Sequence, residues 1–345
     1  MSPEARAEVD AQVLALLVDA EGEPLSGQVI CEKLDLPRRL LLETVDSLRS
    51  RGFVISTGPG WGYRVTELPD GLTAAELAPL LTTNDLGRKL HFHDSLPSTN
   101  DEAQRLADEG VPHGELVIAE DQTGGRGRRG RTWVSTPGKS LLFSLVLRPQ
   151  LPPQRAPELT LVAAVAVCEA ARELGVPDAT IKWPNDVEVH GQKLAGLLLE
   201  LRAQGDLVEH VILGVGVNVN QEESDFPPEL RERATSLREV RGEALSRGLF
   251  CARLLGRLED WLGMHEALGL EPVLERWRQL SGTLGRNVRV ELGDGVRIEG
   301  EATDLDETGA LLVRVASGAV HRIVAGDVEH LRTQPGAQAG MLTSL

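Results

Sequence analysis

Apolar positions in the first part of the chain repeat at helical spacing and then change to short runs typical of strands. The helical spacing predicts three helices, over residues 9–20, 27–34 and 38–51. Two apolar runs, 53–55 and 63–65, flank a Gly-rich tip and predict a β-hairpin. Three helices followed by a hairpin are the order of a winged helix-turn-helix, which we expect for residues 1–66.

From residue 91 to residue 282, strand-length apolar runs alternate with helical periodicity. The runs typical of buried strands are 116–119, 141–147, 181–183, 187–189, 196–201 and 210–219. Helical segments lie between and after them, at 160–174, 247–262 and 270–280. This alternation predicts an α/β domain built on one large mixed sheet.

The remaining segments are shorter. Residues 283–332 hold strand-like runs separated by Gly turns, at 288–292, 296–305, 310–315 and 321–324, and predict a small β-barrel. Residues 67–90 are interpreted as a linker with a short helix near 74–81, and 333–345 as a frayed tail. The predicted fold class is therefore α+β and multidomain.

Composition and charge narrow the class of protein. The chain has 345 residues and a net charge of −16, so any nucleic-acid binding must come from a local patch. The three cysteines are far apart and predict buried, inert thiols rather than a zinc site or a disulfide framework. The N-terminus lacks the apolar core of a signal peptide, and no window reaches the roughly 18 apolar residues of a membrane span. We expect a cytoplasmic protein with no membrane partner.

The most informative local feature is the segment 124–131, which reads Gly-Gly-Arg-Gly-Arg-Arg-Gly-Arg and is called the Gly/Arg loop below. Glycines let the backbone fold closely around a ligand, and arginines supply planar charged groups suited to phosphate and carboxylate. The loop therefore favours binding of a polyanion during phosphoryl or adenylyl transfer. The alternative is a flexible basic loop that binds nucleic acid.

A second motif, residues 98–102, reads Ser-Thr-Asn-Asp-Glu and opens a helix. These residue types are explained by a helix N-cap with a capping box between Thr99 and Glu102. They also suit a pocket for a carbonyl or an anion, because hydroxyl groups there lie beside free backbone N–H groups.

Three further motifs lie at strand ends or inside strands. Residues 182–186 read Lys-Trp-Pro-Asn-Asp and end an apolar strand, where a lysine can meet phosphate or simply sit on an exposed turn. Lys193 precedes Ala195 and Gly196, small residues that permit close backbone approach. Gly214 and Gly216 interrupt another apolar strand, which is unfavourable unless another group approaches closely.

In this order the motifs resemble the biotin–protein ligases of the repressor type, the biotin operon repressor family. The matching segments are Ser98-Thr99-Asn100, then 122–131, 182–186 and 193–196, then Gly214-x-Gly216-x-Asn218. The resemblance covers the central domain, and it implies an SH3-like barrel at the C-terminus.

The resemblance also implies a two-step reaction with biotin, ATP and Mg²⁺. Biotin and ATP form biotinyl-5′-AMP, and a lysine of biotin carboxyl carrier protein then takes the biotinyl group. The residues implied to act in catalysis are Lys193, Arg128 and Arg126. Those implied to bind biotin are Ser98, Thr99, Asn100, Gln122, Arg126, Gly127, Arg128 and Lys193. Those implied to bind ATP are Arg128, Arg131, Lys182, Asn185, Asp186 and Asn218, with Trp133 as a wall of the biotin or adenine pocket.

Regulatory activity is implied as well, as a biotin-responsive repressor that binds operator DNA as a homodimer. Arg38 and Arg39 are the candidate DNA contacts. However, Leu42 and Glu43 stand on the third helix where the family pattern has polar and basic groups. Two alternatives stay open: a ligand-sensing DNA-binding regulator without ligase activity, and a lipoate–protein ligase, a group that by resemblance lacks the Gly/Arg loop.

Overall fold

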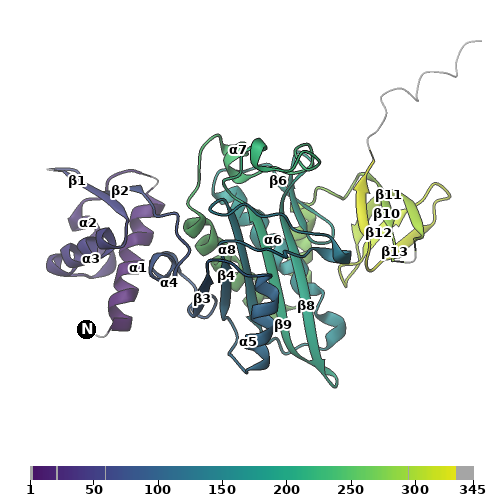
Figure 1. Cartoon of the computed structure of the whole chain (residues 1–345), viewed down its shortest axis with the longest axis horizontal. Helices are drawn as coiled ribbons and strands as arrows, with labels where there is room; N and C mark the ends of the chain where they lie inside the picture. Colours follow the sequence, from purple (N-terminus) through teal and green to yellow (C-terminus); the bar gives the residue numbers. More distant parts are fainter. Residues whose placement is uncertain (1–2, 21, 59, 294, 332–345) are drawn as a thin grey trace, which may run out of the picture.

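The computed structural model describes residues 3–20, 22–58, 60–293 and 295–331. Figure 1 shows three parts in chain order, with the central part between the other two. The interpretation of residues 333–345 as a tail falls outside the described residues. Among the described helices, none is long and apolar enough to cross a membrane.

The N-terminal part consists of three helices and a hairpin, as the apolar spacing predicted. Its elements are α1 (Pro3–Asp19), α2 (Gly27–Leu34), α3 (Arg38–Ser50), β1 (Val54–Gly58) and β2 (Gly62–Glu67). α1 begins six residues earlier than predicted, because the polar segment before residue 9 contains good helix formers such as Ala and Arg. One apolar cluster that includes Leu14, Ile30, Leu41 and Phe53 holds these elements together.

The central part is built on a seven-stranded mixed sheet in the order β3-β4-β5-β9-β8-β7-β6, which confirms the predicted α/β domain. β3 and β4 are parallel and the other neighbours are antiparallel. The strands are β3 (Leu90–His93), β4 (Leu116–Ala119), β5 (Ser140–Leu147), β6 (Ala179–Lys182), β7 (Asp186–Val189), β8 (Gln192–Gln204) and β9 (Leu207–Asn218). β8 and β9 are longer than predicted, and β3 was not predicted.

Helices cover the two faces of this sheet unequally. The helices of this part are α4 (Ala74–Leu77), α5 (Thr99–Asp108), α6 (Glu158–Glu173), α7 (Leu237–Arg241), α8 (Arg247–Leu268) and α9 (Glu271–Leu280). Leu213 and Val215 of β9 face the large core that includes α6, α8 and α9, whereas Ile212 packs against Ala103 and Leu106 of α5. The α5 face is therefore only partly covered by helix, and the residues of the predicted site lie on it.

The C-terminal part is a five-stranded antiparallel sheet in the order β13-β12-β11-β10-β14. The strands are β10 (Asn287–Glu291), β11 (Arg297–Leu305), β12 (Leu311–Arg314), β13 (Val320–Ile323) and β14 (Asp327–His330). The sheet packs on the central part, where the Trp183 indole N–H donates to the Gly309 carbonyl at 3.0 Å. Its buried residues are continuous with the central core.

The segment between the first two parts is packed rather than extended. Leu72 and Leu77 are buried in the central core. Arg247, only 5% exposed at the start of α8, donates through Nε to Asp70 at 3.0 Å and through Nη1 to Glu120 at 2.6 Å. Because Glu120 directly follows β4, Arg247 links this segment to the strand that leads into the Gly/Arg loop.

Candidate functional site

Four residues of the predicted motifs form one row across four strands. Gly216 on β9 lies opposite Gly196 on β8, which lies opposite Asp186 on β7, which lies opposite Lys182 on β6. Directly opposed residues of neighbouring strands share a face. Motifs as far apart as residues 182 and 216 are thus brought together on the α5 face.

The two glycines of this row make room for Trp133. A Cβ added to Gly216 would lie 2.6 Å from the indole, and one added to Gly196 would lie 3.0 Å from it. Trp133 therefore lies directly on the backbone of β8 and β9. Lys193 Nζ lies 5.5 Å from the centroid of the indole ring, within the range of a cation–π contact.

The two lysines of the motifs are paired with different carboxylates. Lys193 Nζ lies 2.8 Å from Asp186 Oδ1, whereas Lys182 Nζ lies 2.8 Å from Glu188. Burial raises the pKa of the Glu188 carboxyl, against the opposing effect of Lys182. Of the two ammonium groups, that of Lys193 is beside the Trp133 indole.

Polar side chains at the start of α5 form a buried cluster. Thr99 donates to Gln122 Oε1 through its backbone N–H at 2.7 Å and through its hydroxyl at 3.0 Å. Ser144 on β5 lies 2.8 Å from the Thr99 hydroxyl and 2.6 Å from Asn100 Oδ1. A Cβ at Gly214 would collide with this Asn100 oxygen. Because Gly214 has no side chain, it leaves room for Asn100, as Gly216 leaves room for Trp133.

The predicted capping box is wrong. Ser98 is the N-cap residue of α5, but its side chain makes no capping hydrogen bond. Thr99 is the first helical residue and turns its hydroxyl to Gln122, while Glu102 pairs with Arg105 at 2.7 Å. The serine and threonine of this motif are therefore not used to cap the helix.

The Gly/Arg loop lies between this cluster and the C-terminal sheet. Arg126 pairs with Asp101 at 2.7 Å and with Glu200 at 3.4 Å. Gly127 N–H donates to the Arg131 carbonyl at 2.6 Å and closes the loop around the short 3₁₀ turn η2 (Arg128–Gly130).

The later arginines of the loop point to the C-terminal sheet. Arg128 donates to Asn185 Oδ1 at 2.8 Å and to the Gly326 carbonyl at 3.2 Å. Arg131 pairs with Asp327 at 2.5 Å. Burial lowers the pKa of the Arg128 guanidinium.

Asn218 is engaged with the backbone next to this centre, whereas Arg38 and Arg39 lie far from it. Asn218 is buried and donates to the backbone carbonyls of Thr235 and Lys193 at 3.0 and 3.3 Å. Arg38 and Arg39 lie on α3 in the N-terminal part, where Arg39 pairs with Glu43 at 2.9 Å.

Sequence reasoning missed several residues of this region. Asp101, Ser144, Glu200 and Asp327 each contact a predicted site residue. Three of them carried a signal: Asp101 lies inside the motif 98–102, and Ser144 and Glu200 are single polar residues within apolar strand runs. Asp327 lies in a segment whose pattern indicates nothing beyond a turn.

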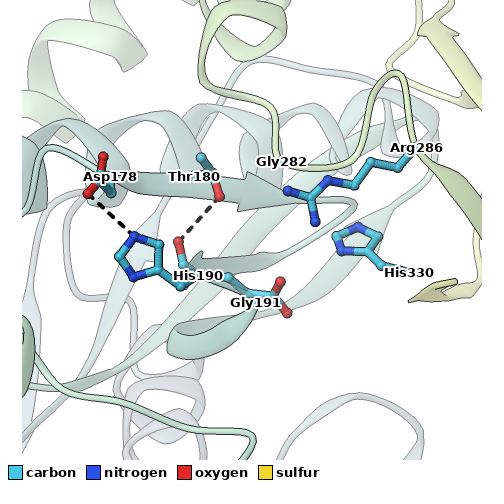
Figure 2. Close-up of a pocket in the computed structure, with 8 residues that line it drawn as sticks. Asp178, Thr180, His190, Gly191, Gly282, Arg286 and His330 are labelled. Carbon is cyan, nitrogen blue, oxygen red and sulfur yellow. Dashed lines mark hydrogen bonds and ion pairs between the residues drawn. The ribbon is translucent and has the colours of Figure 1, made fainter. Parts of the chain in front are cut away.

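A separate pocket of about 200 Å³ lies between β6, β7 and the C-terminal part. Figure 2 shows Asp178, Thr180 and His190 on one side of it and Arg286 and His330 on the other. Burial, helped by nearby cations, lowers the pKa of His330 to about 4, so the imidazole is neutral at pH 7. The pocket contains none of the predicted site residues.

Comparison with known proteins places this geometry in a family. Residues 92–218 match the model of the biotin/lipoate A/B protein ligase family, and residues 283–331 match the biotin protein ligase C-terminal domain. The bifunctional ligase/repressor BirA of Bacillus subtilis is 36% identical over 324 residues, covering 94% of this chain and 99% of that protein. The Escherichia coli protein of the same description is 33% identical, covering 88% and 92%.

A solved structure agrees with these matches. The biotin protein ligase from Aquifex aeolicus in complex with biotin and ATP is 31% identical, covers 71% of this chain and 100% of that chain, and superposes with a TM-score of 0.61. The resemblance inferred from the ordered motifs is confirmed. The chain belongs to the biotin/lipoate A/B protein ligase family and is similar along nearly its whole length to the bifunctional ligase/repressors.

Proposed function

We propose that this chain is an ATP-dependent biotin–[biotin carboxyl carrier protein] ligase and a biotin-responsive repressor. A biotin carboxylate oxygen attacks the α-phosphorus of ATP, pyrophosphate leaves, and biotinyl-5′-AMP forms. A carrier lysine amine then attacks the acyl carbon, and AMP leaves. The observation that carries the proposal is Lys193, which pairs with Asp186 and lies over the Trp133 ring. Trp133 in turn lies on Gly196 and Gly216, called the glycine floor below.

The polar cluster suits the ureido ring of biotin. Ser98, Thr99, Asn100 and Gln122 supply hydroxyl and amide groups at the start of α5, all close to the sheet. Arg126, Gly127 and Arg128 on the Gly/Arg loop would close over the biotin carboxylate and the phosphate of the adenylate. Because such a transfer relies on positioning and charge stabilisation, no side chain needs to be modified covalently.

The glycine floor suits the nucleotide. Lys193 would contact both the biotin carboxylate and the α-phosphate, with Trp133 as a wall of the pocket. Arg128, Arg131 and Lys182 would meet phosphate groups, and Asn185 and Asn218 would complete the ATP site.

Magnesium fits this site as an ion that enters with ATP. Asp186 offers one carboxylate, and the described residues contain no cluster of three His, Cys, Asp or Glu side chains that would hold a metal alone. Mg²⁺ usually binds through one or two carboxylates together with substrate phosphates, which matches this donor set.

The ligase proposal is tested by mixing the protein with ATP, Mg²⁺ and labelled biotin and separating the products. We expect biotinyl-AMP, and transfer of label to a carrier domain when one is added. DNA binding without any adenylate would favour the alternative of a regulator that only senses a ligand. Adenylation of lipoate in preference to biotin would favour a lipoate ligase.

For regulation, we propose that the N-terminal part is a winged helix-turn-helix and that the C-terminal sheet is an SH3-like barrel. A homodimer would place two winged helices on operator half-sites. The edge of β8 supports a dimer surface: β7 pairs with it only up to Gly196, and beyond this point Leu201 is 42% exposed. Sedimentation and DNA-binding measurements with and without biotinyl-AMP test this proposal. If biotinyl-AMP changes neither the sedimentation nor the DNA affinity, only the ligase activity would remain as the proposed function.

A further inference from the structure

A continuous chain of polar contacts runs through the cluster at the start of α5. It begins at Gln122 and passes through Thr99, Ser144 and Asn100, and it ends at Glu200 on β8. Asn100 Nδ2 donates to Glu200 Oε2 at 2.7 Å. Asn100 and Ser144 are nearly inaccessible to solvent, at 3% and 0% exposed.

Both amides in this chain have a fixed orientation. The Glu200 carboxylate can only accept, so Asn100 turns its NH₂ group to Glu200 and its oxygen to Ser144. The Thr99 backbone N–H can only donate, so the carbonyl oxygen of Gln122 faces Thr99. The chain therefore has an acceptor at each end.

Between these two acceptors there are fewer hydroxyl protons than hydrogen-bonding contacts. The contacts Asn100–Ser144, Ser144–Thr99 and Thr99–Gln122 measure 2.6, 2.8 and 3.0 Å. Two hydroxyl groups supply only two protons for these contacts. With both protons donated to the amide oxygens, the two hydroxyl oxygens face each other with free lone pairs. That of Thr99, which is 3% exposed whereas Ser144 is 0% exposed, can accept from a ligand.

We infer that Glu200 is a positioning residue that gives this pocket its acceptor character and thereby selects ligands with N–H donors. The inference rests on the proposed biotin site. The ureido ring of biotin carries two N–H groups, whereas lipoate is a carboxylic acid of similar length without any. A site built to pair with N–H groups discriminates against a ligand that lacks them.

Replacing the carboxylate by an amide tests this directly. In Glu200→Gln the new NH₂ group can donate to Asn100 Oδ1, so the Asn100 amide can turn and present its NH₂ group to Ser144. Ser144 would then donate to Thr99 and Thr99 to Gln122, and no contact in the chain would lack a proton. The size of the side chain is almost unchanged.

Glu200 also contacts Arg126, so a control must separate the two contacts. Asp101→Asn removes the other carboxylate of Arg126 and leaves the Asn100–Glu200 hydrogen bond intact. We therefore expect Asp101→Asn to retain the preference for biotin over lipoate even if it weakens both ligands.

The experiment measures Kd for biotin, desthiobiotin and lipoate, the last by competition, together with KM and kcat for adenylate formation. For Glu200→Gln we expect Kd and KM for biotin and desthiobiotin to rise together by about 10-fold. The Kd for lipoate and the kcat at saturating biotin should stay as in the wild type.

Three outcomes would overturn the inference: an unchanged biotin Kd in Glu200→Gln, an equal weakening of biotin and lipoate, or the same loss of preference in Asp101→Asn. Failure of the wild-type protein to bind biotin would instead overturn the proposed function. Thermal unfolding of both variants shows whether the fold is retained.

Discussion

At the scale of single residues, the environment of Lys193 decides what the site can do. Its ammonium group is 2.8 Å from Asp186 and lies over the Trp133 ring. It is held in place before any ligand binds, and a preorganised cation stabilises negative charge that develops in a transition state. A lysine that is fully solvated on a turn would have neither contact.

Lys193→Ala should reduce adenylate formation by at least about 100-fold, because the growing charge at the α-phosphate loses its cation. Lys89→Ala is the matched control, since Lys89 forms an ion pair of 2.6 Å with Glu115 on the same sheet but away from the glycine floor. Pyrophosphate release measures the rate. Wild-type activity in Lys193→Ala would contradict the assignment.

Residue identity alone could nominate the site but not its internal contacts. Ser98, Thr99 and Gln122 could be named from the sequence because the ordered set of motifs is specific, although each motif alone is weak. The capping interpretation failed because a helix start and a ligand pocket need the same residue types, and only the position of Gln122 decides between them. The role of Ser144 depends on strand pairing between β5 and β9, which local pattern does not encode.

At the scale of elements, two glycines of β9 that are two residues apart each leave room for a different side chain. Gly214 leaves room for Asn100 and Gly216 leaves room for Trp133. Both are paired on both sides within the sheet, so each can be changed without breaking a turn. This spacing of two residues keeps both on one face of the strand.

Gly214→Ala and Gly216→Ala should therefore have opposite ligand preferences. We expect Gly214→Ala to weaken biotin binding about 10-fold with little effect on ATP binding, because a misplaced contact group commonly reduces affinity by this factor. Gly216→Ala should weaken ATP binding more than biotin binding. Isothermal titration with each ligand measures the two affinities. The same pattern of loss in both variants would show that they only disturb the strand.

Helix α3 carries a basic residue that is already neutralised. Arg39 pairs with Glu43, which also pairs with Arg6, and these hydrogen bonds lower the pKa of Glu43. A guanidinium engaged in this way is less available to a phosphate. Glu43, which departs from the family pattern in the sequence, therefore acts through a specific ion pair.

Glu43→Gln should increase DNA affinity several-fold at low salt, and the dependence of log Kd on log salt should steepen by about 0.9 if Arg39 gains one phosphate contact. Glu307→Gln, on the exposed surface of the C-terminal part, changes the net charge equally and serves as the control. Fluorescence anisotropy at several salt concentrations measures both. Equal effects of the two variants would assign the gain to net charge alone.

The pattern of apolar residues predicted most elements, because the sheet is buried and its strands are therefore apolar runs in the sequence. It missed β3 and β14 because each is only four residues long, too short to form a distinct apolar run. It ended β8 too early because residues 202–204 at its end are exposed and two of them are polar. In these cases strand pairing, rather than burial, maintains the extended backbone.

At the scale of the whole molecule, the Gly/Arg loop joins the central and C-terminal parts. It has no apolar side chain between Gly124 and Arg131 that would anchor it in a core. Its position depends on polar contacts such as Arg131 with Asp327. Contacts of this kind open more readily than a packed core does.

Trypsin should therefore cut the Gly/Arg loop readily in the ligand-free protein, and biotin with ATP should protect it by ordering the loop. Asp327→Ala should speed cleavage of the free protein several-fold, because one of the contacts that hold the loop is lost. Mass spectrometry of the fragments over time locates and measures the cleavage. Equal rates with and without ligands would count against a loop that closes on its substrates.

The buried Arg247 limits where the protein can be divided. A stand-alone ligase that starts after Asp70 would remove one of the two carboxylates that pair with this guanidinium and leave it with Glu120 alone, which should lower the free energy of unfolding. Ser246 would also lose its acceptor, the Pro69 carbonyl. Truncated proteins made for crystallography or as labelling enzymes should therefore begin before Pro69, so that Pro69 and Asp70 stay with the catalytic domain.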